Sequence, residues 1–256
     1  MILLALETST PLGSLVIQSL QDSRITTLFE KSWGIPLKMK QAKGHRSPSH
    51  SELATVYLQE GLNHTNLKPN DIELFCVSSG PGSFTGIRVG INTIKTLSYS
   101  AEKPIFTLNS LELMAYPHLD FETPVTAMLN ANKNQIYIAS YLKSHDPNKV
   151  FDILLEPQSL TVREIEKVVP RPGLIIGSGF DFYRDQFSNG FIDLIHKTDT
   201  TITPMASTFS QVLQDHHPKI NFISWMQLTP IHIRASEAEE KLWRGALKPF
   251  LKIEYK

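Results

Sequence analysis

The chain has 256 residues, of which 41% are hydrophobic and 20% are charged. This balance is typical of a folded globular protein and excludes a largely disordered chain. Lys and Arg together equal Asp and Glu, so the formal net charge is zero, whereas proteins that bind nucleic acid alone usually carry a basic excess. The one cysteine, Cys76, excludes an internal disulfide and a cysteine-based zinc site, and we expect it in a strand of the core.

The first 108 residues predict a strand-rich unit with two helices. Residues 2–6 form a short apolar run, as in a strand buried on both faces, and a polar turn leads to the next strand. Between Lys31 and Ser49 the chain is basic and contains Gly and Pro, which predicts a surface loop. We expect strands at 2–6, 15–17, 24–30, 72–78 and 105–108, and helices at 49–61 and 87–101.

The pattern restarts after Asn109, and we place subdomains at 1–108 and 109–225, with a returning segment at 226–256. Capping boxes at Thr161 and Ser236 predict helix starts. An apolar strand runs into a glycine turn near residue 80 and again near residue 177, which indicates two related halves. We expect helices at 111–116, 161–170, 206–214 and from 236, strands at 125–129, 135–141 and 174–176, and an extended segment at 229–234.

The strongest chemical signal is the glycine-rich run from Ser79 to Gly90. It joins a predicted strand to a helix, and unpaired N–H groups at a helix start suit an anion. A Walker loop and a dinucleotide fingerprint are excluded by the glycine spacing and the missing Lys. Packing against a neighbouring element is an equally good explanation of the glycines. Candidate phosphate-binding residues are Gly80, Gly82, Ser83, Thr85, Gly86 and Arg88.

A second candidate lies in the first hairpin, at Glu7, Thr8 and Ser9. A carboxylate followed by hydroxyls can hold a metal-bound phosphate, although a polar hairpin tip is the simpler interpretation. The histidines show no metal-ligand spacing, so we expect no bound metal, and a serine-hydrolase elbow is absent from the sequence.

The run Ser79–Gly90 resembles the glycine-rich signature of the TsaB family, Gly-Pro-Gly-Ser-Phe-Thr-Gly-Leu-Arg-Ile-Gly. Residues 3–9 resemble the opening of that family, with Glu7 where Asp is usual. The segments at 50–53, 109–112 and 231–239 also resemble family segments, whereas residues 116–225 match loosely.

The resemblance implies an α/β actin-like ATPase fold of the RNase H-like (ASKHA) type with two related subdomains. It also implies a role beside a TsaD-like subunit, which transfers a threonylcarbamoyl group to a tRNA adenosine next to the anticodon. The metal-binding His pair of TsaD-like proteins falls on Ser110 and Met114 here, and neither replaces an imidazole. We therefore expect a non-catalytic subunit that binds and activates the transferase; the alternative is an independent ATP-binding enzyme.

Family complexes pair through the first two helices, and the same resemblance gives the expected partners. Besides the TsaD-like subunit these are a TsaE-like ATPase, a second copy when the chain is alone, and tRNA only indirectly. No cofactor is expected to be required, although ATP or ADP could bind at a complex interface. We expect a cytoplasmic protein with no membrane contact. The expected partner face consists of His50, Leu53, Tyr57, Gly86, Gly90, Thr93 and Leu97.

Overall fold

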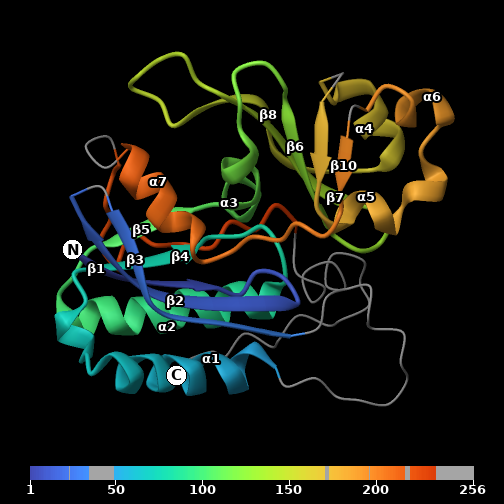
Figure 1. The fold of residues 1–256 in the computed structure, drawn as a ribbon. Helices are drawn as coiled ribbons and strands as arrows, with labels where there is room; N and C mark the ends of the chain where they lie inside the picture. Colours follow the sequence, from blue (N-terminus) through green and yellow to red (C-terminus); the bar gives the residue numbers. More distant parts are fainter. Residues whose placement is uncertain (23, 35–48, 171–172, 196, 217–219, 235–256) are drawn as a thin grey trace, which may run out of the picture.

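Two five-stranded sheets form the framework of the chain (Figure 1). The computed structural model describes residues 1–22, 24–34, 49–170, 173–195, 197–216 and 220–234. The predicted helix at Ser236 and most of the predicted loop before Ser49 lie outside these residues. Among the helices that are described, none has both the length and the hydropathy needed to cross a membrane.

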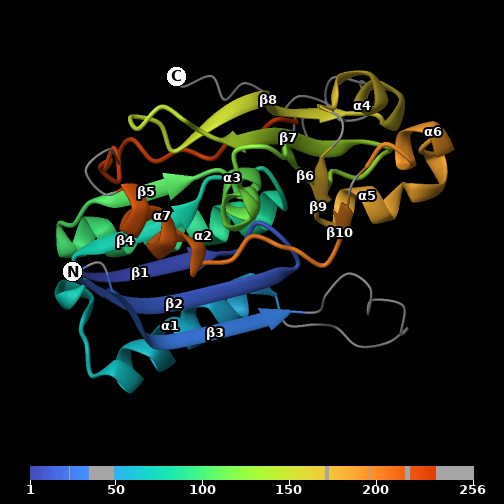
Figure 2. The ribbon, with the colours of Figure 1, turned by 45° about the horizontal axis from the view of Figure 1, so that its top comes forward.

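The first sheet has the strand order β3-β2-β1-β4-β5 (Figure 2). Its strands are β1 (Ile2–Glu7), β2 (Leu12–Gln21), β3 (Arg24–Gly34), β4 (Leu74–Ser78) and β5 (Ile105–Leu108). The strands β1, β2 and β3 are antiparallel, whereas β1, β4 and β5 are parallel. Both faces of this sheet are buried, because Leu4 and Leu6 enter one core while Leu3 and Ala5 enter another.

Helices cover both faces of the first sheet. The helices α1 (His50–Thr65) and α2 (Phe84–Ala101) pack on one face, and α7 (Thr208–His216) packs on the other (Figure 1). A short 3-10 helix, η2 (Pro69–Asp71), precedes β4. Our boundary at residue 225 grouped α7 with the second half, but its Phe209 and Leu213 pack against β1 and β4, so it belongs structurally to the first sheet.

The second sheet repeats the topology of the first. Its order is β10-β9-β6-β7-β8. If β6 is counted as strand 1 and the sheet is read from β8 to β10, the order is 3-2-1-4-5, the same as in the first sheet. Its strands are β6 (Val125–Asn130), β7 (Ile136–Lys143), β8 (Phe151–Leu160), β9 (Leu174–Ile176) and β10 (Lys197–Asp199). The antiparallel and parallel pairings also correspond. The repeat confirms the predicted actin-like α/β fold with two related subdomains.

Short helices surround the second sheet and connect it to the first. On one face, Val162 of α4 and Phe180 of α5 share a core with Met128, and on the other Met114 of α3 packs against Val125. The helices are α3 (Ser110–Ala115), η3 (Tyr116–His118), α4 (Val162–Val168), α5 (Ser178–Phe182), η4 (Arg184–Gln186) and α6 (Asn189–Ile192).

Several predicted boundaries were wrong for identifiable reasons. The strand β3 continues to Gly34, beyond the predicted end at residue 30, because Trp33 pairs with Gly13 and its ring covers that glycine. The helix α1 does not end at Gly61 but at Thr65, since Gly61 makes room for the Phe29 ring. The strands β8 and β10 were not predicted.

Candidate functional site

The glycine-rich turn joins β4 to α2, as predicted. Ser83 is the N-cap of α2, and its hydroxyl accepts a hydrogen bond from the Gly86 N–H. The helix therefore begins at Phe84, three residues before the predicted start, so that the signature residues Thr85 to Gly90 all lie on α2. The turn and the first two turns of α2 face the β1–β2 turn.

The β1–β2 turn packs directly into the glycine-rich segment. The Thr8 hydroxyl donates to the Gly86 carbonyl oxygen at 2.8 Å, and the Ser83 N–H donates to the Ser9 carbonyl oxygen at 2.6 Å. A Cβ atom at Gly82 would lie 2.2 Å from the Ser9 carbonyl oxygen, and one at Gly86 would lie 2.1 Å from that of Thr8. These glycines therefore allow two backbone segments to touch, which is the packing explanation of the motif.

The hairpin tip is buried instead of exposed. Glu7, Thr8, Ser9 and Thr10 each have a relative exposure of at most 5%. The chain itself fills the space beside the predicted phosphate-binding residues, and the geometry gives no support to an open phosphate cradle. Phosphate binding by these residues remains a prediction.

Glu7 lies at the carboxyl end of β1 and is fully buried. One carboxylate oxygen accepts the Ser9 N–H. The other has no hydrogen-bond partner among the described residues, and the same holds for the hydroxyls of Ser9 and Ser110. Burial raises the pKa of the Glu7 carboxyl, and the hydrogen bond from the Ser9 N–H opposes that rise. Burial therefore disfavours the charged form of Glu7 relative to a carboxylate in water.

The end of the described chain covers the glycine-rich turn from the other side. The Ile231 N–H donates to the Ser79 carbonyl oxygen at 2.7 Å. Gly80 has φ +98°, and a Cβ atom there would lie 2.9 Å from the Ile231 carbonyl oxygen. Both segments resemble family segments, but their contact was not predicted, because nothing in either segment indicates its spatial neighbour.

Arg88, a predicted anion ligand, contacts an aromatic ring. Its guanidinium lies 4.0 Å from the centroid of the Phe84 ring, and the His232 ring stacks on Phe84 at 4.3 Å. Ser83 and Thr85 are exposed at the start of α2. The Arg88 guanidinium is thus in contact with an aromatic ring, and anion binding by these three residues stays a prediction.

Ser110 and Met114 occupy the positions of the expected metal pair. Both are buried, and Met114 packs in the core beneath β6, close to Gly177. Within the described ranges, His, Cys, Asp and Glu residues form no group of three that could hold a metal ion. Side chains of this chemistry do not fit the metal centre of the transferase.

The predicted partner face divides into two groups. Gly86 and Gly90 point inward, since a Cβ atom at Gly90 would lie 2.5 Å from the Thr8 hydroxyl, so packing within the chain accounts for them. Leu53, Tyr57, Thr93 and Leu97 are half-buried on α1 and α2. The Tyr57 ring lies against Trp33 and under the Lys31 ammonium.

His50 is part of a local hydrogen-bond chain. The Trp33 indole N–H donates to its Nδ1 at 3.0 Å, and its Nε2 lies 2.6 Å from the Thr10 carbonyl oxygen. Because Nδ1 accepts, Nε2 carries the proton and donates to Thr10. The start of α1 is thus tied to β3 and to the buried hairpin tip.

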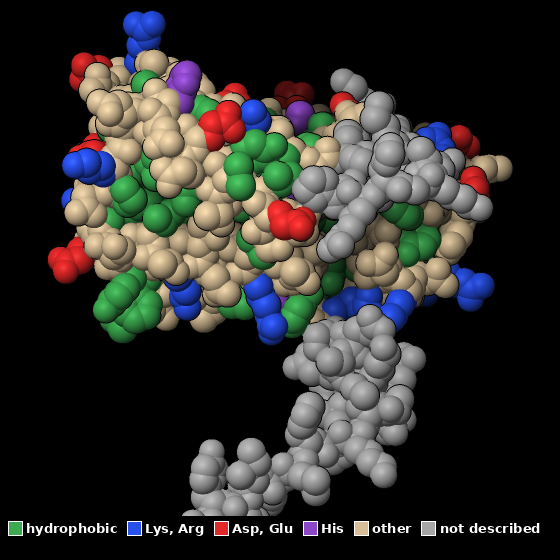
Figure 3. All heavy atoms as spheres, turned by 90° about the horizontal axis from the view of Figure 1, so that it is seen from below, with side chains coloured by type: hydrophobic (Ala, Val, Ile, Leu, Met, Phe, Trp, Pro, Cys, Tyr) green, Lys and Arg blue, Asp and Glu red, His purple; other side chains and the backbone are tan. Residues whose placement is uncertain are grey.

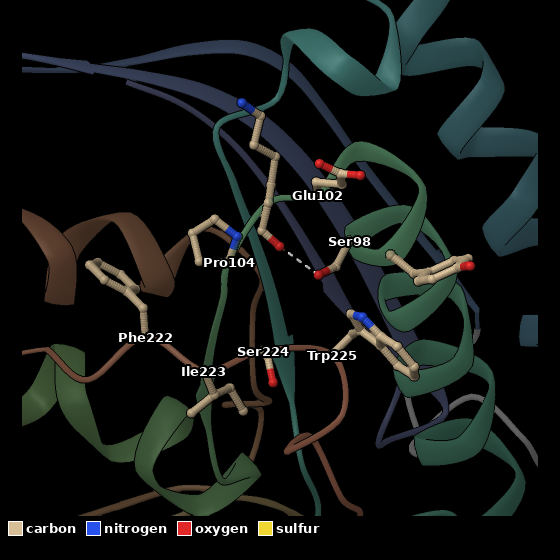
Figure 4. A pocket seen from close by; sticks show the side chains of 9 residues that line it. Ser98, Glu102, Pro104, Phe222, Ile223, Ser224 and Trp225 are labelled. Atoms are coloured by element: carbon tan, nitrogen blue, oxygen red, sulfur yellow. Dashed lines mark hydrogen bonds between the residues drawn. The ribbon is translucent and has the colours of Figure 1, made fainter.

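A shallow pocket of about 520 Å³ lies at the end of α2 (Figure 4). Trp225 lies beside Ser98, whose hydroxyl donates to the Lys103 carbonyl oxygen at 2.6 Å. The Tyr99 ring meets the Trp225 ring edge-on at 5.1 Å. The pocket was not predicted, because residues 222–225 give it one wall and lie far from α2 in the sequence.

Comparison with known proteins identifies the family. The family model of TsaD, tRNA N6-adenosine threonylcarbamoyltransferase, matches residues 45–213, well over half of the chain. The curated protein TsaB of Bacillus subtilis is 27% identical over 55% of this chain and 62% of its own length. TsaB of Haemophilus influenzae is 24% identical over 76% of this chain and 84% of its own length. The chain belongs to the TsaB branch of the TsaD family.

The fold of this chain agrees with that of a solved structure. YeaZ from Pseudomonas aeruginosa superimposes with a TM-score of 0.68 at 18% sequence identity, covering 90% of this chain and 99% of the YeaZ chain. At this identity the likeness establishes the fold alone. It confirms the arrangement of two repeated sheets that the resemblance to TsaB predicted.

Proposed function

We propose that the chain is a non-catalytic subunit of tRNA threonylcarbamoyladenosine biosynthesis that binds and activates a TsaD-like transferase. The observation that carries the proposal is the pair Ser110 and Met114, buried where the transferase is expected to hold its metal-binding histidines. The names of the curated TsaB relatives support the pathway. Contact with tRNA would then be made by the partner, in keeping with the zero net charge.

The outer surfaces of α1 and α2 are the proposed partner face. Val56 on α1 is 56% exposed and Tyr99 on α2 is 64% exposed, and both are apolar for most of their surface. Thr93 and Leu97 are half-buried on α2. Seen from this side, hydrophobic patches alternate with uncharged surface, and charged side chains are scattered (Figure 3). Such a surface suits helix-against-helix packing with a protein partner.

Mixing the chain with its TsaD homologue at micromolar concentration tests the proposal. We expect one heterodimer peak in size-exclusion chromatography, and Thr93→Arg should abolish it by placing a charge in the contact. Gln211→Arg is the matched control, because Gln211 is exposed on α7, which covers the opposite face of the same sheet. Clean separation of the two unmodified proteins would refute the proposal.

Independent ATP binding is the alternative that this geometry does not favour. Thr8 and Ser9 are buried, and residue 231 covers the turn at Ser79. Titration calorimetry with ATP and magnesium decides between the two. Binding tighter than about 100 micromolar by the chain alone would support the ATP-binding enzyme.

A nucleotide at a complex interface is a separate proposal. It predicts that calorimetric titration with ATP or ADP shows a binding heat only when the TsaD homologue is present. A TsaE-like ATPase is the proposed third component, and a homodimer through the same face is proposed for the chain alone. Sedimentation analysis with and without each protein distinguishes these assemblies, because a shared face predicts that the homodimer dissociates when the partner is added.

A further inference from the structure

The last described segment, which we name the C-terminal strap (residues 222–234), runs along the first half of the molecule. Ile223 and Ile105 exchange two backbone hydrogen bonds of 2.8 Å, which anchors the strap beside β5. Leu228 is fully buried in the core under α1 and α2. Ile231 then binds the glycine-rich turn through Ser79. The first ten residues of the strap therefore belong firmly to the first half.

The next residue strengthens this attachment at the start of α2. The rings of His232 and Phe84 stack with an interplanar angle of 23°. The Arg88 guanidinium lies 4.0 Å from the centroid of the same Phe84 ring. Two groups this close to one ring must occupy opposite faces, so Phe84 is held between a strap residue and its own helix.

The strap then reaches the second half through Arg234. Its Nη1 donates to the carbonyl oxygen of Ala131 and, at 3.3 Å, to that of Asn132. Both carbonyls lie in the turn between β6 and β7, which corresponds in the repeat to the β1–β2 turn. One guanidinium thus joins the turn of the second half to a segment anchored on the first.

The β6–β7 turn has an unusual backbone. Asn132, Lys133 and Asn134 have φ values of 59°, 53° and 61°, three successive residues in the left-handed region. Residues other than glycine rarely adopt this region, and a run of three persists only where surrounding contacts fix it. The charge-assisted bonds from Arg234 to two carbonyls of this turn are such contacts.

We propose that Arg234 and the strap form a clasp that fixes the angle between the two halves. The strap is attached to the first half by backbone bonds and by the ring stack, and Arg234 transfers that attachment to the β6–β7 turn. A strap that serves only to close the first core would need Leu228 but not the Arg234 side chain. The two roles therefore make different predictions for substitutions at residue 234.

The full-length chain tests the clasp with one spin label on each half. Thr55→Cys on α1 and Asp193→Cys beyond α6 are exposed positions on the first and second halves. The native Cys76 is fully buried, so it is not labelled. The background then carries Arg234→Ala, Arg234→Lys, His232→Ala or the control Thr229→Ala, an exposed strap position. Pulsed electron–electron double resonance measures the distance distribution between the two labels.

We expect one narrow distribution for the unmodified background and for Thr229→Ala. Arg234→Ala should broaden or shift it, and backbone amides of residues 131–136 should exchange hydrogen about ten-fold faster. Arg234→Lys should be intermediate, because an ammonium lacks the planar fork. An unchanged distribution together with unchanged exchange in Arg234→Ala overturns the clasp. If that variant does not fold, unchanged behaviour of both Arg234→Lys and His232→Ala overturns it instead.

Discussion

The hydroxyl of Thr8 donates a hydrogen bond to the carbonyl oxygen of Gly86 across 2.8 Å, and 78 residues separate the two in the sequence. This contact holds the β1–β2 turn against the helix that carries the family signature. It explains why a glycine stands at position 86, since any side chain there would overlap the Thr8 backbone. Gly86 of the signature therefore serves the packing of α2 against the β1–β2 turn.

Gly86→Ala should lower the free energy of unfolding by about 2 kcal/mol, within the range for overpacking a rigid contact. The gain in helix propensity from alanine, about 1 kcal/mol, is smaller than this cost. Urea denaturation measures the difference. Gly190→Ala is the matched control, because among the described residues no atom beyond its chain neighbours and its own helix backbone lies within 4 Å of its Cβ position. It should be neutral or slightly stabilising. Equal effects of the two substitutions would contradict the packing argument.

Glu7→Gln should remove a pH dependence of stability. Burial raises the pKa of Glu7 above its ordinary value of 4.5. Below that value both the folded and the unfolded states hold the proton, so the stability is fully present. As pH rises toward the raised pKa, only the unfolded chain releases its proton, and the free energy of unfolding falls.

Denaturation of Glu7→Gln from pH 4 to 8 measures this difference against the unmodified chain. We expect the Glu7→Gln variant to become more stable relative to the unmodified chain as pH rises. The amide stays neutral and can still accept the hydrogen bond from the Ser9 N–H. A constant difference across that range would show that Glu7 titrates normally.

Glu112 at the start of α3 should titrate near neutral pH. Burial raises its pKa to about 7, the Asn109 N–H opposes that rise, and the Glu156 carboxylate adds to it. Glu156→Gln removes the neighbouring charge and should lower the pKa of Glu112. Carbon NMR of the carboxyl groups follows the titration directly. If the titration curve of the Glu112 carboxyl resonance is unchanged in that variant, the two carboxylates do not interact.

His50 and Trp33 should be energetically coupled. His50→Ala leaves the buried Trp33 N–H without its acceptor and should cost about 1–2 kcal/mol. In a Trp33→Phe background, which has no indole N–H, the same substitution should cost less. A double-mutant cycle by urea denaturation gives the coupling energy. Additive effects would show that the hydrogen bond contributes nothing, and the assigned role of His50 would then be wrong.

Local signals in the sequence predicted much of the fold. The apolar run of β9 and the capping box at Thr161 each depend on neighbouring residues, and both are where they were expected. The strand β8 was missed because it contains Pro157 and two adjacent exposed apolar residues, Ile153 and Leu154. Its extended form depends on pairing with β7, which no local pattern encodes.

The candidate site was predictable as a sequence feature but not as a geometry. Residues such as Glu7 and Ser83 suggested an anion site because their chemistry suits one. Glu7 is nevertheless buried, and the hairpin tip that follows it packs against Gly86, which lies far along the chain. The choice between packing and binding therefore depended on long-range neighbours, which a single sequence does not reveal.

The return of α7 and Leu228 to the first sheet has a consequence for synthesis on the ribosome. One core of the first half needs Phe209 and Leu213, and the other needs Leu228. A nascent chain that has emerged only to residue 200 therefore exposes apolar strand residues such as Leu3 and Leu74. The half that begins first is completed last, so we expect the two halves to become stable nearly together instead of one after the other.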